Sequence, residues 1–133
     1  GITETPWDEL ARSHLFALPS RREGFPGALV EAMAVGRACV AFDCRSGPRE
    51  ISRDGTDAAL VPAGDVSAFS KALANLMANP DKRAALGERA LAVRDRYRAR
   101  IAAERWARLL REVQGPQAAA SVEDVSAVAE MRK

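Results

Sequence analysis

The chain has 133 residues and a formal net charge of +2, with 47% hydrophobic and 29% charged residues. This length is enough for one domain with a buried core, and the composition excludes a largely disordered chain. No apolar run is long enough to span a bilayer and no signal-peptide pattern opens the sequence.

The charge pattern narrows the classes of partner. Residues 81–112 carry ten Lys or Arg against five Asp or Glu, but acids are interleaved with the arginines there. This arrangement is typical of a solvated helix face rather than of a nucleic-acid or membrane patch. Aromatic residues make up only 5% of the chain, which also counts against base stacking. The sequence therefore predicts no nucleic-acid partner.

Two cysteines, Cys39 and Cys44, flank a short apolar segment. Their spacing and the lack of a companion histidine argue against a zinc site. The sequence leaves a disulfide open, but free cysteines are commonly buried. We expect two reduced thiols in or beside a strand, and no metal.

The first half of the chain alternates helices and strands. Thr5 is a suitable N-cap and Pro6 a suitable first residue for a short helix. A second helix should begin near Pro26 or Gly27 and end before a left-handed cap at Gly36. Short apolar runs predict strands at 15–18, which we expect to be buried, at 38–42 and at 58–61. A single helical turn at 48–52 and a turn at 54–55 are expected between the last two strands.

From Asp65 onward the pattern is helical. Asp65 should cap one helix, and Asn79 with Pro80 should start the next. Apolar residues recur at helical spacing in three stretches, which are Phe69-Leu73-Leu76-Met77, Leu86-Ala90-Val93-Tyr97 and Trp106-Leu109-Leu110-Val113. Residues 114–133 are expected to form a tail that is weakly helical or disordered.

The order strand, helix, strand, turn, strand, helix is typical of a parallel sheet covered by helices. Three strands are fewer than the about five or six of a doubly wound sheet. The sequence therefore predicts an α/β fold over residues 1–113, a partial Rossmann-like parallel sheet flanked by helices that corresponds to the latter half of such a domain.

The stretch from Pro19 to Ala34 is the candidate site, because an apolar strand feeds a glycine-bearing turn that opens into a helix. Unpaired N–H groups and the dipole at the start of a helix favour an anion. Glu23 lies before this helix and Glu31 in its second turn, and carboxylates suit the hydroxyl pairs of sugars. The N–H groups expected to be free between them are those of Gly27, Ala28 and Leu29. This order suits a nucleotide sugar; the alternative is that Glu23 caps the helix and Glu31 is a solvated surface residue.

The pattern Pro19-Ser20-x-x-Glu23-Gly24-Phe25-x7-Glu31 resembles the donor-binding signature of family 4 retaining GT-B glycosyltransferases (glycosyl transferases group 1), which contains an E-x7-E motif. The likeness extends over roughly residues 9–113. It implies that the chain is the second half of the C-terminal, donor-binding Rossmann-like domain. It also implies that an N-terminal acceptor-binding domain, and a basic pair that neutralises the donor diphosphate, lie outside the chain.

The resemblance also implies roles for individual residues. Glu23 would be the catalytic residue, in contact with the donor sugar hydroxyls near the reacting carbon, and Glu31 would bind the ribose hydroxyls. The backbone groups expected to hold the sugar and diphosphate are those of Gly24, Phe25, Gly27, Ala28 and Leu29.

The expected activity is transfer of a hexose-type sugar from a nucleotide sugar, with UDP preferred over GDP, to a glycan, lipid or small-molecule acceptor. Members of the family retain the sugar configuration and use no bound metal, stabilising the departing diphosphate electrostatically. No cofactor is expected, and this chain alone is expected to be inactive. The intact enzyme would be cytoplasmic, with peripheral association at the inner face of the membrane as an option.

Two positions depart from the family pattern. Pro26 stands where many members have Gly, which removes one backbone donor. His14 follows Ser13 where an Ala-Asp pair is common, and we expect a structural role for it. For Arg21 and Arg22 a solvated loop face is preferred over contact with the diphosphate, and for Asp43 a loop-capping role.

Three alternatives stay open. A GT-B epimerase or phosphorylase would share the fold, and a glycoside hydrolase would need its two carboxylates about 5 to 9.5 Å apart. The third is a non-catalytic docking or oligomerisation module derived from the fold, with self-association through an exposed sheet edge or helix surface. In GT-B enzymes the last helix often packs against the N-terminal domain, so exposed apolar surface at Trp106 or Leu110 would instead be an interface left without that domain.

Overall fold

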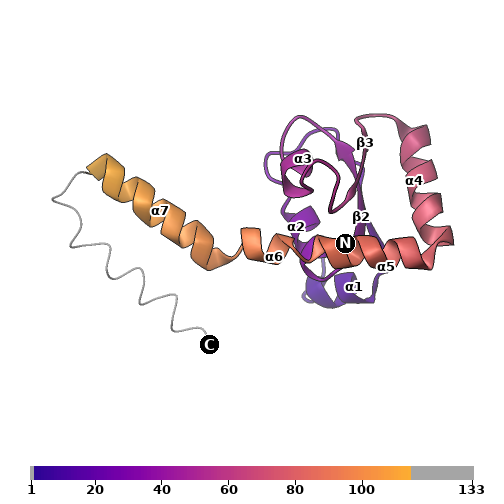
Figure 1. Ribbon diagram of the computed structural model, residues 1–133, viewed down its shortest axis with the longest axis horizontal. Coiled ribbons are helices and arrows are strands. Elements are labelled where there is room, and N and C mark those ends of the chain that lie inside the picture. The colour runs from indigo at the N-terminus through magenta and orange to yellow at the C-terminus, as the bar shows by residue number, and fades with distance from the viewer. Residues whose placement is uncertain (1, 115–133) are drawn as a thin grey trace. The chain divides into compact units, whose positions relative to one another are not determined.

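The computed structural model describes residues 2–114 (Figure 1). Its strands are β1 (Leu15–Leu18), β2 (Ala38–Asp43) and β3 (Ala59–Pro62). Its helices are α1 (Pro6–Arg12), α2 (Gly27–Ala34), α3 (Pro48–Ile51), α4 (Val66–Ala78), α5 (Pro80–Ala90), α6 (Val93–Arg96) and α7 (Ala99–Gln114). The chain divides into two compact units, one ending at Arg94 and one beginning at Asp95, and each is described by itself. The tail predicted at residues 114–133 lies, from residue 115 onward, outside the described residues.

The three strands form one parallel sheet, as expected, and their order in it is β1-β2-β3. Leu15 pairs with Ala38 at one end of the β1–β2 ladder, and Asp43 pairs with Pro62 at the end of the β2–β3 ladder. Because all strands run the same way, the loops that follow them leave the sheet at the same edge. This edge is where ligands bind in open α/β sheets.

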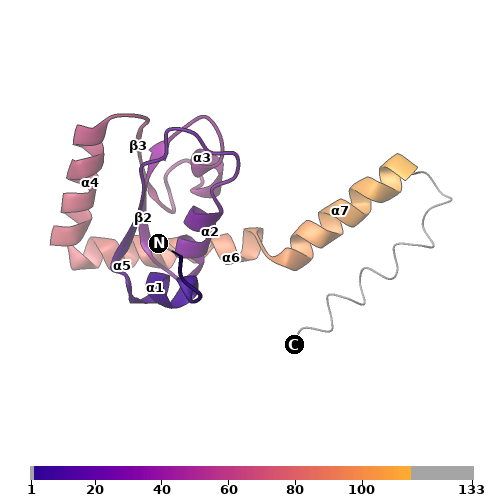
Figure 2. The same ribbon diagram turned by 180° about the vertical axis from the view of Figure 1, so that it is seen from behind.

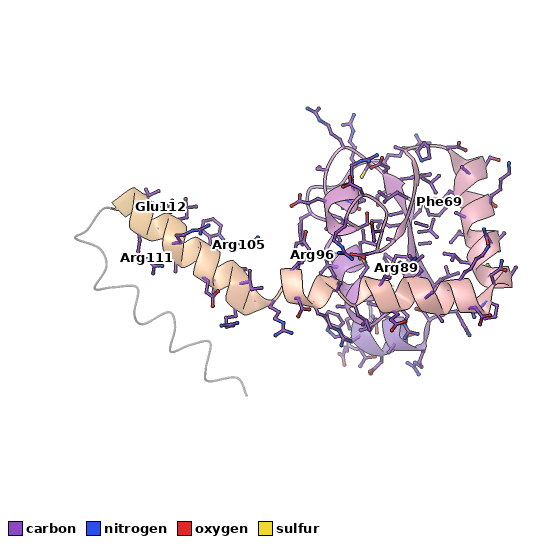
Figure 3. All side chains as sticks on the ribbon, viewed as in Figure 1. Phe69, Arg89, Arg96, Arg105, Arg111 and Glu112 are labelled. Carbon is purple, nitrogen blue, oxygen red and sulfur yellow. The ribbon has the colours of Figure 1, made fainter. Side chains whose placement is uncertain are left out.

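Helices cover both faces of the sheet: α2 and α3 lie on one side and α4 on the other, in both views (Figures 1 and 2). Every side chain of β2 from Ala38 to Phe42 is buried, which is the pattern of a central parallel strand. On the α4 side, Phe42 meets Phe69 edge to face, with ring centroids 4.8 Å apart. Figure 3 labels Phe69. On the other side, α2 buries Leu29 and Met33 completely.

The burial predicted for β1 is wrong. Ala17 is exposed and the other three residues of β1 are only half-buried. The reason is that β1 lies at an edge of the described sheet, with β2 as its single neighbour. An apolar run read from sequence cannot distinguish an edge strand from a central one, because burial depends on neighbours.

Several helix predictions are confirmed, and others need correction. The Asp65 carboxylate caps α4 by accepting a hydrogen bond from the Ala68 N–H at 2.8 Å, as predicted. Thr5 and Asn79 precede α1 and α5 as expected, but neither side chain caps its helix. The Asn79 amide instead donates to the Asn75 carbonyl at 2.7 Å.

The stripe expected to run from Leu86 to Tyr97 is divided between two helices, because α5 ends at Ala90 and α6 begins at Val93. The N–H groups of Leu91 and Ala92 donate to carbonyls three residues earlier, which tightens the end of α5 into a 3₁₀-like turn. The apolar face predicted for α4 also needs correction. It was expected to include Met77, but this side chain is exposed.

Helix α7 carries its apolar stripe on the surface, where Trp106, Leu109, Leu110 and Val113 are all exposed. Its charged side chains form ion pairs one turn apart, such as Arg100 with Glu104 at 3.2 Å. Among residues 2–114, no helix is both long and apolar enough to cross a membrane.

Candidate functional site

The candidate site begins where β1 ends, in the loop of residues 19–26, which we call the Glu23 loop. The chain enters α2 through Pro26, whose φ of −77° and ψ of 74° are those of an inverse γ-turn. The Gly27 N–H closes this turn by donating to the Phe25 carbonyl at 2.9 Å. Because the proline ring restricts φ to this region, Pro26 fixes the angle at which the loop meets the helix. The predicted start of the helix near Pro26 or Gly27 is confirmed, since α2 begins at Gly27.

Two of the three N–H groups that were expected to be free are engaged. The Gly27 N–H closes the γ-turn, and the Leu29 N–H donates to the Pro26 carbonyl at 3.0 Å. The Ala28 N–H has no hydrogen-bond partner among residues 2–114. The expectation of three free donors is therefore wrong for the unliganded helix, because the turn at Pro26 folds two of them back onto loop carbonyls. The roles of these groups in holding a ligand stay predictions.

The two glutamates that bracket the turn are half-buried. Neither the Glu23 nor the Glu31 carboxylate forms an ion pair or a side-chain hydrogen bond with any of residues 2–114. Half-burial without a cation partner leaves the carboxylate oxygens available to accept hydrogen bonds from hydroxyls.

The remaining predicted site residues differ in their solvent exposure. Gly24, Phe25 and Ala28 are exposed, with Phe25 at 61%. Leu29 is fully buried, so its side chain belongs to the core and only its backbone is available for a role in the site. The side chains thus divide between an exposed loop and a helix anchored in the core.

The Glu23 loop is joined to the loop that follows β2. The Ser46 hydroxyl donates a hydrogen bond to the Glu23 carbonyl at 2.7 Å. Gly47, at φ +95°, lies so close to Pro26 that a Cβ on it would fall 2.3 Å from the proline Cδ. These contacts link residues more than 20 positions apart, and no pattern in the sequence signalled them.

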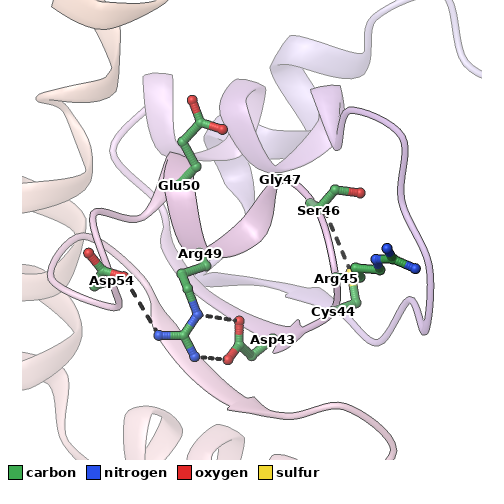
Figure 4. Close-up of a pocket in the computed structure, with 8 residues that line it drawn as sticks. All are labelled: Asp43, Cys44, Arg45, Ser46, Gly47, Arg49, Glu50 and Asp54. Atoms are coloured by element: carbon green, nitrogen blue, oxygen red, sulfur yellow. Dashed lines mark hydrogen bonds and ion pairs between the residues drawn. The ribbon is translucent and has the colours of Figure 1, made fainter.

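A surface hollow lies beside this second loop, lined by residues 43–47, 49, 50 and 54 (Figure 4). At its base the Arg49 guanidinium donates to both carboxylate oxygens of Asp43, the Nε contact measuring 3.1 Å. A further ion pair joins Arg49 to Asp54 at 3.6 Å. The hydrogen bonds to Asp43 raise the pKa of the Arg49 guanidinium above its usual value, so Arg49 stays protonated. Asp43 therefore binds Arg49 at the loop base, a contact close to the loop-capping role expected for it.

The loop after α3 is built differently. Asp57 is fully buried and accepts two hydrogen bonds from Arg53, at 2.7 and 2.6 Å. The Ser52 hydroxyl accepts a hydrogen bond from the Gly55 N–H at 3.1 Å. The ion pair was not predicted from the sequence, although its i, i+4 spacing was visible as a weak signal.

Arg21 and Arg22 lie on a solvated loop face, as expected, whereas the structural role of His14 stays a prediction. Arg21 and Arg22 are exposed and form no ion pair among residues 2–114, and His14 is also exposed. Cys39 and Cys44 are buried free thiols, which confirms the prediction for them. Burial raises the pKa of the Cys39 thiol to about 12, so this sulfur stays protonated.

Together, the fold and the site define an α/β domain with a strand–loop–helix unit and two unpaired carboxylates at the ligand-binding edge of a parallel sheet. A family model described as "Glycosyl transferases group 1" matches residues 2–93. The chain belongs to this family.

Relatives and a solved structure agree with this assignment. The chain is 38% identical over 114 residues to an exopolysaccharide phosphotransferase of Streptomyces coelicolor, a match that covers 85% of the chain and 12% of that protein. It is 34% identical over 73 residues to a lipopolysaccharide 1,6-galactosyltransferase of Salmonella typhimurium, which covers 52% of the chain and 20% of that protein.

The crystal structure of TarM superposes with a TM-score of 0.74 and 27% identity, covering 82% of this chain and 22% of that one. This likeness confirms the predicted fold class, a partial Rossmann-like sheet of the GT-B type. The chain spans no more than 22% of the length of any of these three proteins.

Proposed function

We propose that this chain is the nucleotide-sugar-binding part of a retaining glycosyltransferase that moves a hexose-type sugar to a glycan, lipid or small-molecule acceptor. A UDP-sugar is the preferred donor. The observation that carries the proposal is the placement of two half-buried, unpaired carboxylates, Glu23 and Glu31, on either side of the start of α2 at the carboxyl edge of the sheet. The family assignment and the galactosyltransferase relative support it.

In this proposal the two acids do different work. Glu23, in the loop before α2, accepts hydrogen bonds from hydroxyls of the donor sugar near the reacting carbon. Glu31, one turn into α2 and on a helix anchored in the core, accepts hydrogen bonds from the ribose diol. A carboxylate is well suited to each task because its two oxygens can accept from two adjacent hydroxyls.

The start of α2 lies between the acids and would face the diphosphate. The Ala28 N–H is unpaired among the described residues, and the helix dipole favours negative charge there. The Gly27 and Leu29 N–H groups would join it by exchanging their loop carbonyls for phosphate oxygens. These donors would stabilise the charge that develops on the departing nucleotide diphosphate, together with a basic pair that we place outside this chain.

In this proposal the acceptor site lies in a second domain of a longer protein. The match to only 12% to 22% of the three reported proteins is consistent with that arrangement. The relative matched over 85% of the chain is named a phosphotransferase, so sugar transfer by the whole protein is itself part of the proposal.

Calorimetry with UDP, GDP and their hexose conjugates tests the donor assignment. We expect UDP and UDP-hexoses to bind more tightly than the guanine nucleotides, and Glu31→Ala to weaken UDP binding about tenfold, as loss of charge-assisted hydrogen bonds should. Glu88→Ala is the matched control, since Glu88 is an exposed helical glutamate on α5. If no nucleotide binds, even in a longer chain that includes a complete donor domain and an acceptor domain, the transferase proposal is wrong.

A second candidate is a docking module that has kept the fold without the chemistry. The exposed apolar residues of α7 favour it, because four large side chains on one helix are unusual on a free surface. Sedimentation of the chain with and without Trp106→Glu separates the two candidates. A docking module should self-associate or bind a partner through α7 and should not bind nucleotides. A donor domain should bind nucleotide with or without the Trp106→Glu substitution.

A further inference from the structure

The carbonyl of Glu23 is bound by a side chain from a different loop. Ser46 lies in the loop after β2, 23 residues further along the chain, and its hydroxyl donates to the Glu23 carbonyl at 2.7 Å. The family motif contains Glu23 but not Ser46. The position of the Glu23 backbone therefore depends on a residue outside the motif.

A second contact follows immediately. Gly47 packs against the Pro26 ring, with room for no side chain, because a Cβ there would meet Pro26 Cδ at 2.3 Å and Cγ at 2.9 Å. Ser46 and Gly47 thus touch the Glu23 loop at two points, one at the glutamate itself and one at the turn that leads into α2. Two points of contact restrict rotation of the loop as well as its translation.

The loop that makes these contacts is fixed at its base. Asp43, the last residue of β2, holds Arg49 through two hydrogen bonds, and Arg49 also pairs with Asp54 (Figure 4). Pro48 and Ile51 of α3 are buried. The short segment between Asp43 and Pro48 therefore spans two anchored ends, which limits how far Ser46 can move.

We propose that Ser46 is a positioning residue, which with Gly47 holds the Glu23 loop in the orientation in which Glu23 meets the donor sugar. The part of the proposal that concerns the sugar rests on the proposed function; the support of the loop does not. In this role Ser46 acts through the backbone of Glu23, whose carbonyl accepts its hydrogen bond. Its loss should therefore impair discrimination between a nucleotide sugar and the free nucleotide, while leaving nucleotide binding through Glu31 unchanged.

The first test needs no ligand. The Glu23 carbonyl and the Gly24 N–H belong to one peptide unit, so losing the Ser46 hydrogen bond should shift the Glu23 carbonyl carbon and Gly24 nitrogen resonances. It should also lower the order parameter of Gly24. We expect these changes in Ser46→Ala and not in Ser46→Thr, which keeps the hydroxyl. Unchanged resonances and order parameters in Ser46→Ala would overturn the support role.

The matched control is Ser13→Ala. The Ser13 hydroxyl also donates to a backbone carbonyl, that of Leu10 at 2.8 Å, but this bond lies at the end of α1. If Ser13→Ala changed the Gly24 signals as much as Ser46→Ala, the effect would be a general loss of stability and the proposal would fail.

The second test uses the ratio of UDP-hexose affinity to UDP affinity. In Ser46→Ala we expect this ratio to fall about fivefold, with UDP affinity unchanged and with recovery in Ser46→Thr. An equal loss for both ligands, or an unchanged ratio, would contradict the positioning role toward the sugar. If neither ligand bound, even in the longer chain with a complete donor domain and an acceptor domain, the proposed function would fail, and the resonance experiment would still decide the support of the loop.

Discussion

Two loops of the first unit differ in the contacts that hold them in place. The loop of residues 52–58 contains an ion pair of its own, Arg53–Asp57, and hydrogen bonds to Ser52, beside one hydrogen bond from Arg89 of α5 to the Thr56 carbonyl at 3.0 Å. The Glu23 loop has no ion pair of its own among the described residues and is held by Ser46 and Gly47 of its neighbour. The loop that carries the candidate catalytic residue is thus held by contacts from a neighbouring loop rather than by an ion pair of its own.

This difference indicates which loop residues contribute mainly to stability and which contribute to the candidate site. Binding residues are often found on loops that a rigid scaffold positions, and a loop supported from outside can keep its own side chains free for a ligand. Changes within residues 52–58 should lower stability and leave the site intact. Changes in the supporting loop should act on the site.

The largest effect is expected from Gly47→Ala. The new Cβ would meet the Pro26 ring and would also require a non-glycine residue at φ +95°, so we expect a loss of about 3 kcal/mol in unfolding free energy. Gly64→Ala is the matched control, because Gly64 has φ +85° and a Cβ added there would have no neighbour within 4 Å among the described residues. It should cost about 1 kcal/mol. Equal losses in chemical denaturation would show that the contact with Pro26 is unimportant.

Asp57→Ala should have the next largest effect on stability. It removes a fully buried carboxylate and both of its hydrogen bonds to Arg53, so the thermal midpoint should fall by several degrees. Asp54→Ala, at a neighbouring carboxylate that is 80% exposed, should change it little. Nucleotide affinity should be unchanged in both variants at temperatures where they are folded. Weaker binding in folded Asp57→Ala would mean that the two loops are not independent.

A smaller effect is expected at the third loop of the same edge, between β3 and α4. Asp65→Ala removes the cap that accepts the Ala68 N–H, at a cost of about 1 kcal/mol. Because this loop makes its own cap, like residues 52–58, the change should not alter the Gly24 resonances. Asp65→Asn should recover most of the stability, since asparagine is also a good N-cap.

The smallest effect concerns β2, which carries the supporting loop. Burial raises the pKa of the Cys39 thiol from 9.0 to about 12, so the folded state binds this proton more tightly than the unfolded state does. The stabilisation is complete below about pH 9 and is lost as the pH rises toward 12. Between pH 8 and 9.5 the unsubstituted protein should lose less than about 1 kcal/mol relative to Cys39→Ala. Identical pH dependence in denaturation experiments would show that Cys39 is accessible to solvent when folded.

Local sequence signals were sufficient for much of the fold. The three strands followed from short apolar runs, and the starts of α2, α3 and α4 followed from Pro26, Pro48 and Asp65, whose side chains act on adjacent backbone. Each of these signals concerns residues within one turn of the element it defines.

Features that depend on distant neighbours were missed. The exposure of β1 is set by which strands lie beside it, and the exposure of Met77 by which face of α4 meets the sheet. The contact of Ser46 with Glu23 joins separate loops, so no periodicity or spacing indicated it. The motif located the site, while the support of the site came only from the three-dimensional arrangement.

The central claim is that Glu23 binds the sugar of the donor and Glu31 binds its ribose. Measuring the affinities of each variant for both UDP and a UDP-hexose tests this claim most directly. Glu31→Ala should weaken both ligands by the same factor, about tenfold, because both contain the ribose. Glu23→Ala should leave UDP affinity unchanged and remove the additional affinity contributed by the sugar. Equal losses of UDP affinity in the two variants would contradict the division of roles.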